Sequence, residues 1–386
     1  MFAERMAEIP FSGIRDIFET CNRLENEGRD VVHLEIGRPD FDTPEPIKEA
    51  AMRALAEGEV HYTSNYGIRP LRSQIATKYR ELYGLEYDAD SGIVVTAGGT
   101  EAVLVTVLAL VDPGDEVLIP DPCWTYEPSI RMAGGKPVRY TLDAETGFQP
   151  DVKSLREGVS AETSLLIVNS PHNPTGSVLT EDSVDKLAQF ATEHDLFVLS
   201  DEIYERITYG DTHVPLATAD GMHERTITVS GLSKAYSMTG WRLGYLAAPP
   251  ELVDPIVRAR QYTSTCANSF AQHGGVRAVQ GGDELAGPLV DTFAERRDAL
   301  VDRLDAIPGM TCPDPTGAFY AMPTTPDGVT DETAFADALL TDAGVATVPG
   351  PVFGSRAEGR IRIAYTVPVE RIHEAFDRVE AWLRDD

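Results

Sequence analysis

Short apolar runs rich in β-branched residues alternate with longer segments of helical periodicity through the middle of this sequence. The runs that predict strands are residues 92–96, 116–120, 164–170, 196–204, 226–234 and 243–249. Helical segments follow from Thr100, from near Trp124 and after Thr180, whose hydroxyl is expected to cap its helix. An alternation of this kind predicts a mostly parallel sheet that is covered by helices on both faces.

The last hundred residues have a different pattern. A long helical stretch at 285–306 precedes short apolar runs, a helix near 332–342 and a final helix. This order predicts a second, smaller α+β domain. Two units also fit the length of 386 residues, because one hydrophobic core usually serves roughly 100 to 200 residues.

The charge balance excludes several classes of partner. The chain has 33 Lys and Arg residues against 62 Asp and Glu residues, so its formal net charge is −29. A surface this negative repels phosphate backbones and anionic lipids, so we expect no binding to nucleic acid or membranes. Only six of the basic residues are lysines, which favours a salt-rich (halophilic) cytoplasm over the alternative of an ordinary acidic protein.

The cysteines and the first residues both indicate an intracellular protein. The four cysteines are widely separated and form no metal-ligand spacing, so they predict reduced thiols rather than disulfides or a zinc site. The first residues lack the basic and apolar regions of a secretory signal. We therefore expect a cytoplasmic protein without a metal.

One of the six lysines stands at the end of a predicted strand, in VSGLSKAYSMTGWRLGY. Lys234 is surrounded there by serines and glycine, and Arg242 follows eight positions later. An amine can attack a carbonyl to form a Schiff base, and hydroxyls with a guanidinium can hold a phosphate beside it. A lysine at a strand end is more often a solvated side chain, so the hypothesis needs support from other segments.

Three other strand ends supply polar groups. Asp201 and Tyr204, in SDEIY, can pair with a ring nitrogen and with a ring oxygen, and Asn173 lies in the rigid turn NSPHNPTG. Either segment is equally consistent with an ordinary turn. GGTEAV opens a helix, where Gly99, Thr100 and Glu101 can direct amides and a hydroxyl at a phosphate; this pattern is weak by itself.

Six segments, in this order along the chain, together resemble a known family. They are EIGRPDFDTP, HYTSNYGIRPLR, TAGGTEA, NSPHNPTG, SDEIYERI and GLSKAYSMTGWRLGY. The chain resembles the fold type I pyridoxal-phosphate aminotransferases of class I/II, in the branch with aspartate and aromatic aminotransferases of archaea and bacteria. The resemblance extends from about Ile9 to the last helix.

The resemblance implies a fold class and domain bounds. We expect an α/β protein with a three-layer aminotransferase-like fold, a mostly parallel central sheet and a smaller α+β domain. Residues 1–45 would form an N-terminal arm and part of the small domain. Residues 46–285 would form the large domain that binds pyridoxal phosphate, and residues 286–386 the small C-terminal domain.

The resemblance also implies roles around the cofactor ring. Lys234 would be linked to pyridoxal phosphate and then serve as general base and acid. Asp201 would keep the ring nitrogen protonated, so that the ring withdraws electrons. Tyr204 and Asn173 would bind the phenolic oxygen of the ring, and Trp124 would stack on its face.

The phosphate would be held at the other end of the cofactor. The expected ligands are Arg242, Gly99, Thr100 and Ser233, with Glu101 contributing at most its amide. Tyr62, in HYTSNYG, would reach the phosphate of a second subunit, which implies a homodimer with composite active sites.

Substrate binding would depend on one arginine of GRIRIAYT. Arg362 would grip the α-carboxylate, assisted by Asn173, Trp124 and the backbone of Gly37. Arg360 is the alternative, because positions two apart share one face of a strand.

Three departures from the family pattern concern substrate and phosphate. Arg38 replaces a common glutamate, and Glu101 stands where aspartate-specific relatives often have a lysine that attracts a second carboxylate. The loss of this lysine argues against strict specificity for dicarboxylates, and Arg38 and Arg69 are the candidates to restore a positive site. Gly231 stands where some relatives have a phosphate-binding serine, so Ser230 or Ser233 would replace it.

The resemblance predicts an aminotransferase that moves an amino group from an L-amino acid, of aspartate or aromatic type, to a 2-oxo acid such as 2-oxoglutarate. A β-lyase, or other chemistry at the α-carbon on the same fold, is the nearest alternative. A catalytically inactive cofactor-binding protein and a regulator fused to a DNA-binding module are remote ones. The retained site residues oppose the first, and the short N-terminal segment and negative charge oppose the second.

Overall fold

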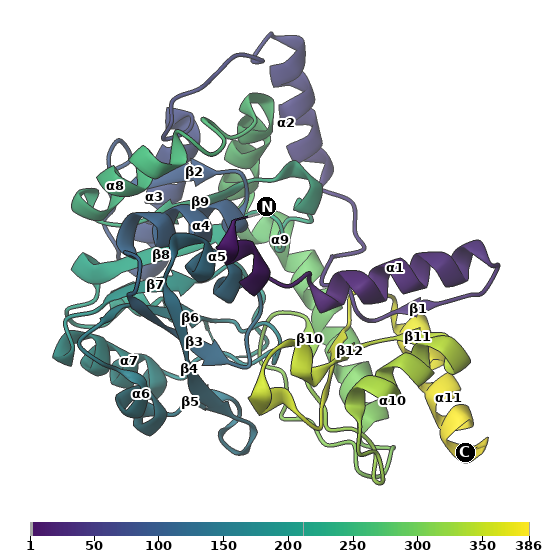
Figure 1. Ribbon diagram of the computed structural model, residues 1–386. Coiled ribbons are helices and arrows are strands. Elements are labelled where there is room, and N and C mark those ends of the chain that lie inside the picture. The colour runs from purple at the N-terminus through teal and green to yellow at the C-terminus, as the bar shows by residue number, and fades with distance from the viewer. Residues whose placement is uncertain (1–2, 211, 386) are drawn as a thin grey trace.

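The computed structural model describes residues 3–210 and 212–385, in which a large sheet layered between helices lies beside a smaller α+β region (Figure 1). Among the described residues, the large sheet has eight strands in the order β2-β9-β8-β7-β6-β3-β4-β5. Their bounds are β2 (Ile93–Thr96), β3 (Glu116–Asp121), β4 (Lys136–Asp143), β5 (Gln149–Pro150), β6 (Thr163–Asn169), β7 (Phe197–Asp201), β8 (Thr226–Gly231) and β9 (Gly244–Ala247).

The predicted mostly parallel sheet is confirmed. Strands β8, β7, β6, β3 and β4 run parallel to one another, whereas β9 is antiparallel to both β2 and β8 and β5 is antiparallel to β4. The sequence analysis did not predict β4 or β5. Strand β4 has alternating apolar and polar residues, KPVRYTLD, rather than a continuous apolar run, because it lies near the edge of the sheet.

Helices cover both faces of this sheet. Side chains of α4 (Gly99–Leu110), α5 (Tyr126–Ala133) and α8 (Pro250–Arg260) pack on one face, together with strand residues such as Ile167. Side chains of α3 (Arg69–Tyr83), α7 (Glu181–Glu193) and α9 (Ser269–Leu304) pack on the other, together with strand residues such as Leu166. Adjacent residues of a strand face opposite sides, so runs buried on both faces are apolar throughout.

Two further helices, α6 (Val152–Gly158) and α2 (Glu45–Ala56), accompany the large sheet. Helix α6 lies beside β4, and α2 packs against α9. Helix α7 begins as predicted, with the Thr180 hydroxyl accepting a hydrogen bond from the amide of Ser183. No helix of the described residues has the length and apolar character needed to cross a membrane.

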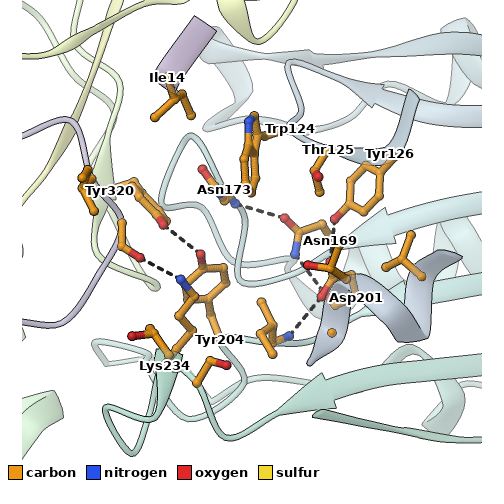
Figure 2. Close-up of a pocket in the computed structure, with 18 of the residues that line it drawn as sticks. Ile14, Trp124, Thr125, Tyr126, Asn169, Asn173, Asp201, Tyr204, Lys234 and Tyr320 are labelled. Atoms are coloured by element: carbon orange, nitrogen blue, oxygen red, sulfur yellow. Dashed lines mark hydrogen bonds between the residues drawn. The ribbon is translucent and has the colours of Figure 1, made fainter. Parts of the chain in front are cut away.

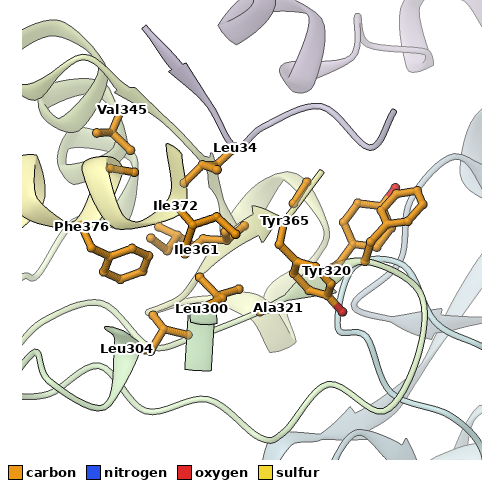
Figure 3. Packing of buried hydrophobic residues seen from close by; sticks show 14 of the residues in the cluster. Leu34, Leu300, Leu304, Tyr320, Ala321, Val345, Ile361, Tyr365, Ile372 and Phe376 are labelled. Carbon is orange, nitrogen blue, oxygen red and sulfur yellow. The ribbon is translucent and has the colours of Figure 1, made fainter. Parts of the chain in front are cut away.

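The smaller region joins the two ends of the chain. Strand β1 (Val32–His33) pairs in parallel with β11 (Val345–Ala346), and β13 (Ile361–Ala364) lies between β10 (Tyr320–Ala321) and β12 (Val348–Pro349). Helices α1 (Gly13–Asn26), α10 (Glu332–Ala338) and α11 (Val369–Asp385) accompany them. Leu34, Leu300, Ile361 and Phe376 meet in its apolar core (Figure 3).

Helix α9 connects the large layer with this region. The predicted boundary between residues 285 and 286 falls inside α9, close to Gly282, where the backbone leaves the helical conformation (φ 47°, ψ −128°). The bounds of the domains stay a prediction.

Candidate active site

A cavity of about 410 Å³ lies where β6, β7 and β8 end and the smaller region begins. Most residues singled out in the sequence line it, namely Gly37, Gly99, Thr100, Trp124, Asn173, Asp201, Tyr204, Ser233, Lys234, Arg242 and Arg362. The structure therefore brings together, in one cavity, residues that are up to 325 positions apart in the sequence, from Gly37 to Arg362. Glu101 and Tyr62 are not among the residues that line it.

Lys234 points into this cavity from the turn after β8 (Figure 2). Its Nζ donates a hydrogen bond of 2.7 Å to the carbonyl oxygen of Gly37. Burial, followed by the positive charges of Arg362 and Arg242, lowers the pKa of Lys234 to about 8. A larger fraction of this amine is therefore neutral and nucleophilic near neutral pH than for a solvated lysine.

Asp201 ends β7 as a partly buried carboxylate. It accepts hydrogen bonds from the Tyr126 hydroxyl, at 2.8 Å, and from the amide of Ile203, at 3.3 Å. Burial raises the pKa of Asp201 to about 6, and a positively charged group beside it would lower that pKa again. The site thus suits a protonated ring nitrogen. Tyr126 was not selected from the sequence, because it stands at the start of α5 rather than at the end of a predicted strand.

Tyr204 is paired with a residue that the sequence analysis missed. Its hydroxyl lies 2.8 Å from that of Tyr320, on β10 of the smaller region (Figure 2). Asn169 was also missed. Its side-chain amide donates to the backbone oxygen of Asp201 at 2.8 Å, and its side-chain oxygen accepts the amide of Asn173 at 3.0 Å. Asn169 therefore joins the turn after β6 to the end of β7.

The N-terminus of α4 forms an anion cradle with Arg242. Gly98 precedes the helix, and no side chain caps the first amides, which include those of Gly99 and Thr100. A Cβ added at Gly98, where φ is 88°, would lie 2.6 Å from Nη2 of Arg242, so only glycine leaves room for the guanidinium. Ser233 lines the same end of the cavity.

Three further residues from the sequence analysis lie away from the cavity. Ser230 is fully buried and its hydroxyl contacts Glu205 at 3.3 Å, so of the two serines only Ser233 lines the cavity. The carboxylate of Glu101 turns toward Thr263, Ser264 and the amide of Ala97. The other residue, Tyr62, is 88% exposed in this chain.

Arg362 enters the cavity from β13. Its Nη1 donates to the side-chain oxygen of Asn173 at 3.2 Å, and its Nη2 donates to the backbone oxygen of Glu35. The guanidinium lies 4.8 Å from the ring centre of Tyr320 and 4.9 Å from that of Phe353. Two rings and two oxygens thus fix its plane, while its buried Nε has no partner among the described residues.

Arg360 does not share this environment. It precedes β13, and its Nη1 donates to the backbone oxygen of Met322 at 2.9 Å. Neither Arg38 nor Arg69 lines the cavity: Arg38 is exposed, and Arg69 pairs with Asp90 at 3.1 Å. Neither arginine adds a positive charge to the cavity that the described residues form, and the hypothesis that one of them restores a positive site stays a prediction.

The charges of the cavity have a clear pattern. Lys234, Arg242 and Arg362 line it, and none of them has a carboxylate within ion-pair distance among the described residues. Asp201 is the acidic residue in the lining. The cavity therefore suits a ligand with two anionic groups and one cationic ring position.

Comparisons with known proteins agree with this geometry. Residues 29–379 match the family described as aminotransferase class I and II. The chain is 40% identical to an aspartate aminotransferase of Pyrococcus abyssi, over 99% of this chain and 98% of the relative. It is 39% identical to aromatic-amino-acid aminotransferase 2 of Thermococcus litoralis, with the same coverage. The structure of a Thermus thermophilus aspartate aminotransferase with maleate is 36% identical, with a TM-score of 0.94 and 98% of each chain covered.

The residues present fit the cofactor of this family. The uncapped amides of α4 with Arg242 can take a phosphate, the partly buried Asp201 can take a ring nitrogen, and the Lys234 amine is the available nucleophile. The predicted three-layer fold, with its smaller α+β region, is also confirmed. The chain belongs to the class I and II aminotransferases and is a pyridoxal-phosphate-dependent enzyme.

Proposed function

We propose that this aminotransferase moves the amino group of an aromatic or aspartate-type L-amino acid to a 2-oxo acid such as 2-oxoglutarate. The convergence of Lys234, Arg242 and Arg362 on one cavity, without carboxylate partners among the described residues, is the observation that supports it most. Arg242 would serve the phosphate, Lys234 the reacting amine and Arg362 the carboxylate that every donor and acceptor of this reaction contains.

Pyridoxal phosphate supplies the electron sink that stabilises negative charge at the α-carbon of the substrate. Arg362 would hold the α-carboxylate in a plane set by Tyr320 and Phe353, which directs the hydrogen on the α-carbon toward Lys234. The Nζ of Lys234 would take that proton from the α-carbon and return it to C4′ of the cofactor, on the other side of the amino nitrogen and two bonds away. Asp201, supported by Tyr126, would keep the proton on the ring nitrogen.

The part of the cavity nearest to α1 is apolar and favours aromatic donors. Ile14 of α1 and Ile36 line the cavity, and Figure 2 shows Ile14 beside Trp124. A second carboxylate of aspartate would find no further cation in the lining that the described residues form, since Arg362 is the cation at this end. 2-Oxoglutarate is one methylene longer than the oxo acid of aspartate, so its second carboxylate can reach closer to solvent.

We expect phenylalanine and tyrosine to exceed aspartate in kcat/KM by at least ~10-fold, because an unpaired carboxylate in an apolar cavity loses its hydration. The measurement is the change in cofactor absorbance when each donor is mixed with the enzyme in high salt, which needs no acceptor. Alanine and valine serve as small apolar controls. Aspartate reacting as fast as the aromatic donors would overturn this ranking and point to a cation from another subunit.

We further propose a homodimer in which Tyr62 of each subunit reaches the phosphate site of the other. Three aromatic rings are largely exposed in the single chain: Tyr62 at 88%, Phe11 at 93% and Tyr262 at 85%. Such exposure of large apolar side chains favours a surface that a second subunit covers. Light scattering in high salt should give twice the chain mass of 42.1 kDa, and Tyr62→Phe should weaken cofactor binding without changing that mass. A monomer with full activity would refute the composite site. The cytoplasmic and salt-rich setting remains a prediction.

A further inference from the structure

The backbone of the segment that follows β1 accepts hydrogen bonds from two of the three cations that line the cavity, Arg362 and Lys234. The carbonyl oxygen of Glu35 accepts from Nη2 of Arg362, and that of Gly37 accepts from Nζ of Lys234. Between them, the oxygen of Ile36 accepts from the Thr366 hydroxyl at 3.1 Å. The position of this backbone therefore decides where the cationic groups point.

The pairing of β1 with its neighbours ends just before these carbonyls. Leu34 makes the last backbone contacts, with its amide donating to Ala346 at 3.0 Å and its oxygen accepting from Ala364 at 2.7 Å. Residue 35 must therefore be held in place by its side chain and by Arg362.

The side chain of Glu35 is anchored by one residue. It is 0% exposed, its Oε1 accepts from Nδ1 of His33 at 2.8 Å, and its Oε2 has no hydrogen-bond partner among the described residues. The other ring nitrogen of His33, Nε2, donates to Glu25 of α1 at 3.0 Å. A buried carboxylate with one partner depends strongly on that partner, because an isolated buried charge is costly.

His33 acts here as a cation rather than as a metal ligand. Cys21, His33 and Glu35 each offer an atom of a kind that can bind a metal, and these three atoms lie within 4.8 Å of one another. Hydrogen bonds with Cys21 and Glu35 raise the pKa of His33 to about 11. With both ring nitrogens protonated and donating to carboxylates, the ring has no lone pair left for a metal ion.

We propose that the pair formed by the partly exposed His33 and the buried Glu35 is a positioning device for Arg362: it fixes the carbonyl of Glu35, which in turn orients the guanidinium toward the substrate carboxylate. Breaking the hydrogen bond between His33 and Glu35 would leave a buried carboxylate unpaired, so this hydrogen bond persists. While it persists, the backbone at residue 35 stays in one position. This inference rests on the proposed role of Arg362.

The test replaces Glu35 with leucine, which removes the anchor without burying an unpaired charge. Glu35→Leu should raise three quantities by the same ~5 to 10-fold, because a small misplacement of a substrate-binding group weakens binding by such factors. These are KM for the amino acid, KM for the 2-oxo acid, and the dissociation constant of 3-phenylpropanoate, measured from the cofactor absorbance. The kcat should stay within ~2-fold, because Lys234 is held by the carbonyl of Gly37 and the intervening carbonyl of Ile36 has its own anchor, the Thr366 hydroxyl.

Matched variants separate positioning from folding. Glu35→Gln keeps an acceptor for His33 and should recover affinity to within ~2-fold of the wild type. Glu25→Gln removes the exposed partner of the same ring and should leave the dissociation constant unchanged. If Glu35→Leu does not fold, His33→Leu breaks the pair from the other side and is measured in the same way.

A double-mutant cycle with Arg362→Lys shows whether the pair acts through Arg362. The effect of Glu35→Leu should fall below ~2-fold in the Arg362→Lys background. Unchanged 3-phenylpropanoate binding by Glu35→Leu, or a full effect that persists with Arg362→Lys, overturns the inference. If Arg362→Lys itself binds 3-phenylpropanoate as tightly as the wild type, the proposed role of Arg362 fails together with it.

Discussion

Replacing Lys234 with alanine is expected to lower turnover of donor and 2-oxo acid by ~10⁴-fold or more, because the variant loses both the attachment point and the proton-transfer group. The rate is measured with phenylalanine and 2-oxoglutarate in high salt, at saturating pyridoxal phosphate. The folded state should persist, because an alanine leaves the turn after β8 and its backbone contacts intact.

Lys186→Ala is the matched control for this loss. Lys186 lies on the exposed face of α7, where it pairs with Asp182. Its removal should leave turnover within ~2-fold, since exposed ion pairs contribute little to stability. A Lys234→Ala enzyme that keeps turnover near the wild-type rate would contradict the mechanism, and equal losses in both variants would indicate a general effect of removing a lysine.

Arg362→Lys is expected to lower kcat/KM for donor and acceptor alike by ~10²-fold, because an ammonium keeps the charge but loses the planar, two-pronged contact with a carboxylate. The wild-type guanidinium is fixed by Asn173, by Glu35 and by the rings of Tyr320 and Phe353. A lysine at this position cannot use that arrangement. Steady-state kinetics with varied amino acid and varied 2-oxo acid check the prediction.

Arg360→Lys makes the same chemical change two residues earlier. Arg360 donates to Met322 and lies beside the ring of Phe148, outside the cavity. Its kcat/KM should stay within ~3-fold of the wild type, as for most substitutions away from a site. The opposite pattern, with the large loss in Arg360→Lys, would assign the carboxylate to Arg360.

The central strands and the polar groups at their ends could be predicted because both are local features of the chain. A run such as LFVLSDEIY is apolar where it is buried on both faces and becomes polar where the strand ends at the cavity, as Asp201 shows. Strand β4 was not predicted because only its alternate residues are apolar. Over a few residues, this pattern also occurs in loops.

Contacts between distant segments could not be predicted in the same way. Tyr320 meets Tyr204 across 116 positions of sequence, and Tyr126 meets Asp201 across 75. Neither tyrosine stands in a polar motif, so its hydroxyl gains a role only when two elements pack together. The choice between Arg360 and Arg362 likewise depended on where β13 begins, which the alternation of the sequence does not reveal.

The most direct test of the account is to locate the cofactor on the chain. Reduction of the enzyme with borohydride fixes pyridoxal phosphate to the amine that holds it, and peptide mapping by mass spectrometry identifies that amine. The account predicts the label on the peptide that contains Lys234, which lines the cavity, and none on Lys78, which is buried in a pair with Glu205. A label on any other lysine, or no label on a fully active enzyme, would contradict it.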